Sequence, residues 1–89
     1  MTEFSLKSET KRLKGYRFEY RLFEDSTSVD GITYPCYSVY ASVSGNGYFD
    51  EMTVRDVSAD RSTAERVFGE IVRGRAAPCT LADVIEDMI

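Results

Sequence analysis

The stretch that decides the fold is residues 16–54, YRFEYRLFEDSTSVDGITYPCYSVYASVSGNGYFDEMTV. It contains two dipeptides, Asp30-Gly31 and Asn46-Gly47, that are typical of two-residue hairpin turns, because Asp, Asn and Gly tolerate the positive φ angles of a type I′ turn. Around these turns apolar and polar residues alternate with the period of a strand that buries one face. The stretch therefore predicts three consecutive antiparallel strands.

Counting outward from the two turns fixes which residues face each other. Leu22 is expected opposite Val39 and Tyr20 opposite Ala41, and the second turn sets Ala41 opposite Met52. Each of these pairs is apolar, and a shift of one residue at either turn would move one partner to the wrong face. The sequence therefore predicts one continuous apolar face on the sheet.

After Val57 the period of the apolar residues changes to 3.6, which predicts an amphipathic helix. Gly74 suits the end of this helix, and Pro78 blocks its continuation. Thr80 is a candidate cap for a second, shorter helix whose apolar stripe is Leu81, Val84, Ile85 and Met88. Both helices need an apolar surface to cover, and the apolar face of the sheet is the one large enough.

The predicted fold class is α+β: a three-stranded antiparallel β-meander with one face packed by two C-terminal helices (βββαα). A chain of 89 residues has room for one core. Residues 14–89 are therefore expected to form a single domain. Residues 1–13 are polar and weakly patterned, and are interpreted as a polar N-terminal tail or a loosely attached element.

Composition and cysteine content indicate an ordinary globular protein, with 43% apolar and 29% charged residues. No apolar stretch approaches the roughly 18 residues that span a bilayer, and the amino terminus has no signal-peptide pattern. Cys36 and Cys79 fit no paired metal or redox spacing. We therefore expect a cytoplasmic protein with reduced thiols and no membrane partner.

The chain contains no histidine, which removes the commonest general base and metal ligand. Asp83 and Asp87 have a spacing that could share a cation, but a solvated helix face is the favoured interpretation. Cys79 precedes the second predicted helix, with no general base for its thiol. We expect no catalytic residue, metal or cofactor. A small histidine-free enzyme remains the third hypothesis for function.

The charge is unevenly distributed, since residues 1–21 hold six Lys or Arg against three Glu in a chain of net charge -4. Lys7, Lys11, Arg12 and Lys14 form a basic segment, which makes a nucleic-acid or anionic-surface binder the second hypothesis. Nucleic acid is the less favoured partner, because the aromatic residues that follow, Tyr16 and Phe18, are expected on the face that the helices cover. There they could not stack on bases, and they are interpreted as core.

The same register places three aromatic residues, Phe23, Tyr40 and Phe49, on the second face of the sheet, together with Arg55. A solvated sheet face normally carries polar residues, so these side chains indicate cover by something. The candidates are the N-terminal segment, a second copy of the chain as a homodimer, or a different protein. The leading hypothesis is a non-enzymatic protein-interaction or regulatory module.

The C-terminal half resembles a family of small uncharacterised bacterial domains. The resemblance rests on Val54-Arg55-Asp56-Val57-Ser58, the helix that follows, Pro78, and Leu81-Ala82-Asp83-Val84-Ile85-Glu86-Asp87. With the preceding hairpins it covers about residues 16–89. It implies a bacterial protein of unknown function and transfers no catalytic residue.

Overall fold

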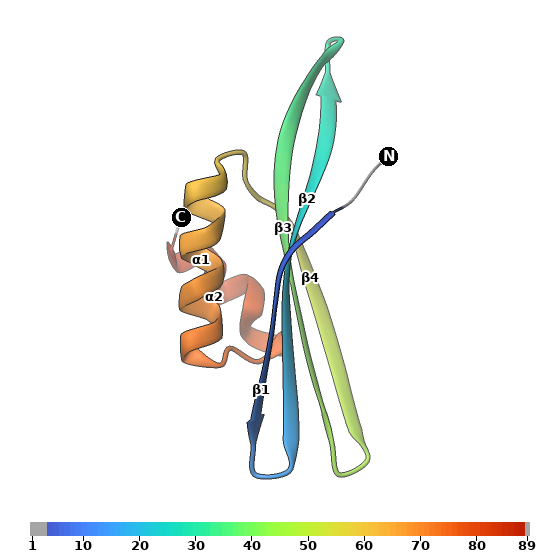
Figure 1. Ribbon diagram of the computed structural model, residues 1–89, viewed down its shortest axis with the longest axis vertical. Helices are drawn as coiled ribbons and strands as arrows, with labels where there is room; N and C mark the ends of the chain where they lie inside the picture. The colour runs from blue at the N-terminus through green and yellow to red at the C-terminus, as the bar shows by residue number, and fades with distance from the viewer. Residues whose placement is uncertain (1–3, 89) are drawn as a thin grey trace.

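The computed structural model describes residues 4–88 and has one antiparallel sheet with helices on one face (Figure 1). The strands, in the order β1-β2-β3-β4, are β1 (Phe4–Leu13), β2 (Tyr16–Val29), β3 (Ile32–Gly45) and β4 (Tyr48–Ser58). They are followed by α1 (Arg61–Gly74), the short 3-10 helix η1 (Pro78–Thr80) and α2 (Leu81–Met88). The molecule is elongated, 48 × 25 × 18 Å. The α+β class with two C-terminal helices is confirmed.

The predicted number of strands is wrong, because residues 4–13 form the edge strand β1 and the meander has four strands. Residues 1–3 of the predicted tail lie outside the described residues. Lys14 and Gly15, with φ of 51° and 84°, make the turn from β1, and Leu13 pairs with Tyr16 across it. Lysine is not a usual residue at a positive φ, and β1 is polar on both faces. The sequence therefore gives neither a turn signal nor an alternation here.

The predicted register is confirmed at both tight turns. Leu22 pairs with Val39 and Tyr20 with Ala41 across the first, and Ala41 pairs with Met52 across the second. Asp30 and Asn46 have φ of 52° and 51°, each followed by a glycine at 78°, as two-residue turns with two positive φ angles require. Turn chemistry and apolar pairing thus specify the same register.

A bulge in β4 resets the alternation of side chains close to α1. The β3–β4 register shifts between Tyr37 and Val39, and Asp56 opposite this shift has φ of 55°. Between the pairs formed by Tyr37 and Val39, residues 55–57 of β4 lie opposite Ser38 alone, so the regular alternation of side chains is interrupted there. Val54 and Val57 therefore both pack toward the helices, although they are three positions apart and would lie on opposite faces of a regular strand.

The hydrophobic core lies between the sheet and the two helices. Leu22, Val39 and Ala41 from the sheet are fully buried, and Val67 and Ile71 of α1 are equally buried against them. The Tyr20 hydroxyl donates a 2.9 Å hydrogen bond to the Ala76 carbonyl oxygen, which joins β2 to the segment after α1. Burial raises the pKa of Tyr20 to about 12.

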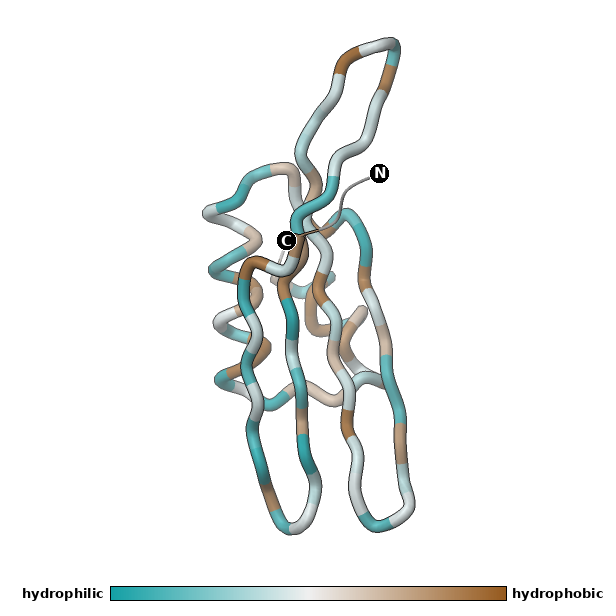
Figure 2. Tube along the Cα trace, turned by 45° about the vertical axis from the view of Figure 1, so that its right-hand side comes forward, coloured by the Kyte–Doolittle hydropathy of each residue, from teal (hydrophilic) through white to brown (hydrophobic). Residues whose placement is uncertain are grey.

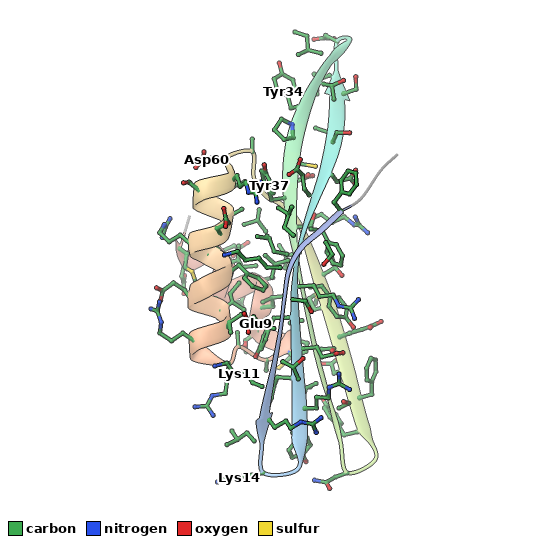
Figure 3. The ribbon with its side chains drawn as sticks, in the orientation of Figure 1. Glu9, Lys11, Lys14, Tyr34, Tyr37 and Asp60 are labelled. Atoms are coloured by element: carbon green, nitrogen blue, oxygen red, sulfur yellow. The ribbon has the colours of Figure 1, made fainter. Side chains whose placement is uncertain are left out.

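Helix α1 begins and ends with capping interactions. The Asp60 carboxylate accepts a 2.9 Å hydrogen bond from the Thr63 backbone N–H and one from the Thr63 hydroxyl, and these bonds lower the pKa of Asp60. At the other end Arg75 is left-handed, with φ of 51°, and Ala76 N–H bonds back to the Ile71 carbonyl. Figure 3 shows Asp60 at the first turn of the helix.

The β2–β3 hairpin extends beyond every other element as a two-stranded ribbon, residues 25–36, which we call the arm. β1 reaches only Glu24, and β4 reaches only Tyr37, so within residues 4–88 the arm has no third strand and no helix beside it (Figure 1). Val29, Ile32 and Tyr34 are 53%, 56% and 43% exposed, and Figure 2 shows hydrophobic positions close to its tip. Figure 3 places Tyr34 on the arm.

Candidate functional site

The sheet face opposite the helices, called the outer face from now on, holds the residues that the sequence predicted for a partner. The structure brings three of the four together: Phe23, Tyr40 and Arg55 line one hollow of about 300 Å³ with Arg21 and Thr53. β2, β3 and β4 each contribute, and Arg21, Tyr40 and Thr53 lie in one row across the sheet. The hollow thus depends on the register that the two turns set.

The Tyr40 side chain is held from two sides. Its hydroxyl donates a 2.8 Å hydrogen bond to Glu51 Oε2, and the Arg21 guanidinium carbon lies 5.8 Å from its ring centroid. Partial burial and, to a smaller extent, the Glu51 carboxylate raise the pKa of Tyr40. The ring is therefore fixed in place before any partner arrives, which lowers the entropic cost of binding.

Two buried serines lie beside Tyr40 on the outer face of β3. Ser38 and Ser42 are each 3% exposed; Ser38 pairs with Phe23 of β2, and Ser42 pairs with Glu19 of β2 and Glu51 of β4. Because a small serine lies on each side of Tyr40 along this face of β3, side chains of β2 and β4 can form the walls of the hollow. No buried polar side chain within residues 4–88 lacks a hydrogen-bond partner.

Phe49, the fourth predicted residue, lies apart from the others. It pairs with Ser44 near the β3–β4 turn and is 60% exposed. Thr53, which pairs with Tyr40, is four residues further along β4, a distance of roughly 13 Å along the strand. Phe49 therefore lies on the predicted face but outside the hollow.

The predicted basic segment does not form one surface. Lys7 and Lys11 lie on the side of β1 that faces α1, whereas Arg12 pairs with Arg17 and lies on the outer face. Figure 3 shows Lys11 beside α1 and Lys14 at the turn. Alternate residues of a strand point to opposite faces, so four cations close together in sequence are divided between two surfaces.

Part of the positive charge beside α1 is already neutralised. Lys7 Nζ lies 3.1 Å from Glu65 Oε1, and this hydrogen bond lowers the pKa of Glu65. Arg73, on the opposite wall of the same groove, lies 2.6 Å from Glu70. This groove, of about 390 Å³, therefore offers an anion less charge than its sequence suggests.

Neither the acidic residues nor the cysteines form a reactive cluster. Within residues 4–88, no three His, Cys, Asp or Glu side chains are placed to hold a metal ion. Both cysteines are free thiols; Cys79 is exposed, and burial followed by the Asp56 carboxylate raises the pKa of Cys36. A raised pKa lowers the thiolate fraction, so Cys36 is a weak nucleophile at neutral pH.

The interpretation of Tyr16 and Phe18 as core residues is confirmed in part, since Phe18 packs against the hydrophobic cluster. Both face the helix side, but Tyr16 is only half-buried, and both line an open pocket with Val43 and Tyr48 beyond the end of α1. Alternation predicts the face on which a side chain lies, but not how far along the strand the helices extend. In the sequence, the one indication of this pocket is that these aromatic residues lie around Gly45 in the predicted register.

A family model described as a family of unknown function (DUF6514) matches residues 1–89. The chain belongs to DUF6514. The DUF6514 match includes β1 as well as the residues 16–89 on which the resemblance in the sequence rests. No curated protein and no solved structure matches the chain.

One further finding concerns the helices. Among residues 4–88, none of the helices has the length and apolar character needed to cross a membrane.

Proposed function

We propose that this protein is a non-enzymatic protein-interaction module, with a regulatory role, whose binding surface is the outer face of the sheet. The observation that carries the proposal is the hollow lined by Arg21, Phe23, Tyr40, Thr53 and Arg55. No helix within residues 4–88 covers this face, and its central ring is held rigidly. Rigid aromatic and arginine side chains in a concave patch are the commonest anchors of protein interfaces.

The chemistry of the hollow selects a particular kind of partner. Its two charged residues, Arg21 and Arg55, are both cationic, and Phe23 and Tyr40 supply apolar surface. Arginine binds carboxylates through paired hydrogen bonds, and aromatic rings bury apolar side chains. The partner we propose is therefore a segment of another protein that presents an acidic side chain next to an apolar one.

The proposed setting is the bacterial cytoplasm. Its support is the pair of free thiols, which suit a reducing compartment. Self-association through the outer face and binding of nucleic acid are the competing uses of the same surface. For nucleic acid the favourable feature is the cross-strand pair Arg12 and Arg17.

The test is a selection of random peptides displayed on phage against the folded protein. Peptides that carry an acidic and an apolar residue should be enriched. Their affinity should fall about 10-fold for Arg21→Ala, because a hydrogen bond to a charged group is lost. Arg66→Ala is the matched control, since Arg66 is exposed on α1, away from the sheet.

Three results would contradict the proposal. The first is a selection without enrichment, or peptides that bind both variants equally. The second is a dimer in light scattering that becomes a monomer in Tyr40→Ala, which would assign the outer face to self-association. The third is binding of a labelled single-stranded oligonucleotide that Arg21→Ala weakens and that salt abolishes.

A further inference from the structure

The helix side of the sheet has an uncovered end that forms a pocket of its own. α1 ends at Gly74 and η1 packs on β3 and β4, but the β1–β2 and β3–β4 hairpins continue beyond them (Figure 1). The pocket there measures about 320 Å³ and has as its walls Tyr16, Phe18, Val43, Tyr48, Asp50 and residues 77–79. It lies on the opposite side of the sheet from the outer face.

Gly45 lies next to this pocket, between two of the residues that line it. Gly45 lies against Tyr16 of β2 on one side and pairs with Tyr48 of β4 on the other, so the two tyrosines flank it across the sheet. A Cβ at this position would lie 2.4 Å from the Gly15 carbonyl oxygen. The close approach of the two hairpins therefore excludes any side chain between the tyrosines.

The aromatic walls of this pocket suit a cation. The Tyr16 ring lies over Gly45, since its Cδ1 atom would be 3.2 Å from a Cβ at that position, and Tyr48 stands on the other side of Gly45. A cation is attracted to an aromatic face within about 6 Å of the ring centroid. Phe18, which is next to Tyr16 on the same face of β2, adds a third aromatic wall.

The charge of the pocket agrees with its aromatic character. Asp50 is the one charged residue among those that line it, and it pairs with Val43 on the floor. A carboxylate beside three aromatic rings favours a cation, whereas the remaining walls, which include Ala77 and Pro78, are apolar. A quaternary ammonium group meets both conditions, because it is charged but has no N–H whose hydrogen bond an apolar wall would leave unmade.

We infer that this pocket binds a small quaternary ammonium compound, with Tyr16, Phe18 and Tyr48 around the cation and Asp50 as its counter-charge. A volume of about 320 Å³ suits a small molecule. The inference is independent of the partner proposed for the outer face, since no residue is shared between the two sites.

The test uses choline and its neutral isostere 3,3-dimethylbutan-1-ol, which has the same shape without the charge. Each is titrated into the ¹⁵N-labelled full chain at constant ionic strength, and amide chemical shifts are followed. Choline should shift the signals of residues 15–18, 43–50 and 77–79 in a saturable manner. The isostere should bind about 10-fold more weakly, because it lacks the cation–π and carboxylate attraction.

Two variants and a control locate the site. Tyr48→Ala and Asp50→Asn should each weaken choline binding about 5-fold or more, and the spectrum itself reports that the fold is retained. Tyr34→Ala removes an exposed tyrosine of the arm and should leave binding unchanged.

Equal affinity for the isostere, shifts that do not saturate, or binding unaffected by Asp50→Asn would overturn the inference. A tripeptide containing trimethyllysine provides the final comparison. If it binds more tightly than choline, the site takes a methylated side chain of a protein, and the assignment to a small molecule is wrong.

Discussion

Gly45 lies where the turn after β1 approaches β3 so closely that a Cβ atom would be 2.4 Å from the Gly15 carbonyl oxygen. Its φ of 147° also disfavours a side chain. Gly45→Ala should therefore lower the free energy of unfolding by about 2 kcal/mol or more, because strands β2 and β3 must separate locally. Urea denaturation followed by circular dichroism measures the change.

Gly69 provides the matched control for this substitution. It lies inside α1, and a Cβ added there would meet nothing within 4 Å. Gly69→Ala should raise the free energy of unfolding by about 0.5–1 kcal/mol, since alanine has the higher helix propensity. A change of stability in the same direction for both variants would contradict steric exclusion at Gly45.

Tyr20 gives stability a dependence on alkaline pH. Its pKa rises from 10.0 in the unfolded chain to about 12 in the fold, so the neutral phenol stabilises the fold fully below pH 10. Between pH 10 and 12 the unfolded tyrosine ionises while the folded one does not, and this contribution is lost at about 1.4 kcal/mol per pH unit.

Tyr20→Phe tests both the hydrogen bond and the pH dependence. At neutral pH it should cost about 1–2 kcal/mol, because the Ala76 carbonyl loses its partner. Above pH 10 wild type should lose stability more steeply than the variant, so the difference between them shrinks. Denaturation curves at about pH 8, 10 and 11 would contradict this if the difference stayed constant.

At the level of single residues, the sequence predicted the structure wherever one residue type has one strong conformational preference. Asp30-Gly31 and Asn46-Gly47 were recognised as turns because both positions tolerate positive φ. Lys14-Gly15 adopts the same geometry and was missed, since lysine has no such preference. The close approach of Gly45 to Gly15 joins two positions far apart in the sequence, so no local pattern predicts it.

At the level of elements, the arm formed by residues 25–36 contributes little to the core. None of its residues belongs to the hydrophobic cluster, and an isolated two-stranded ribbon is marginally stable in water. Replacing residues 26–35 with Asn-Gly keeps the Asp25–Cys36 pair as the last rung and gives a two-residue turn. The free energy of unfolding should change by less than about 1 kcal/mol.

The comparison for this shortened protein is Ile71→Ala, which removes a fully buried side chain from α1. That variant should lose about 2–5 kcal/mol under the same denaturation conditions. A shortened protein that is destabilised as strongly as Ile71→Ala would show that the arm is part of the cooperative unit.

The elements that sequence could predict are those with a buried face. β2 and β3 alternate between apolar and polar residues, and α1 repeats its apolar residues with the period of a helix. The register of the two strands and the buried faces of all three elements were predicted correctly. β1 is an edge strand, exposed along almost its whole length, so nothing in its pattern distinguishes it from a tail. The hollow on the outer face was predicted in part, because Phe23, Tyr40 and Arg55 follow from register, whereas the separate position of Phe49 and the role of Arg21 do not.

At the scale of the whole molecule, the two open edges of the sheet carry charges of opposite sign. β1 has Lys7, Lys11 and Arg12, whereas β4 has Asp50, Glu51 and Asp56. Pairing of two β1 edges or of two β4 edges brings like charges together, which opposes symmetric edge-to-edge dimers. This arrangement opposes pairing between like edges, whereas β1 of one copy and β4 of another carry complementary charges.

The order of the elements also sets the sequence of events during synthesis. Each strand pairs with the next one along the chain through a two-residue turn, so the hairpins can close one after another with short loops, as in rapidly folding proteins. The helices that cover the apolar face come last. A newly made chain therefore carries a complete sheet with an open apolar face until residues 61–88 have left the ribosome, and this is the interval in which a chaperone would protect it.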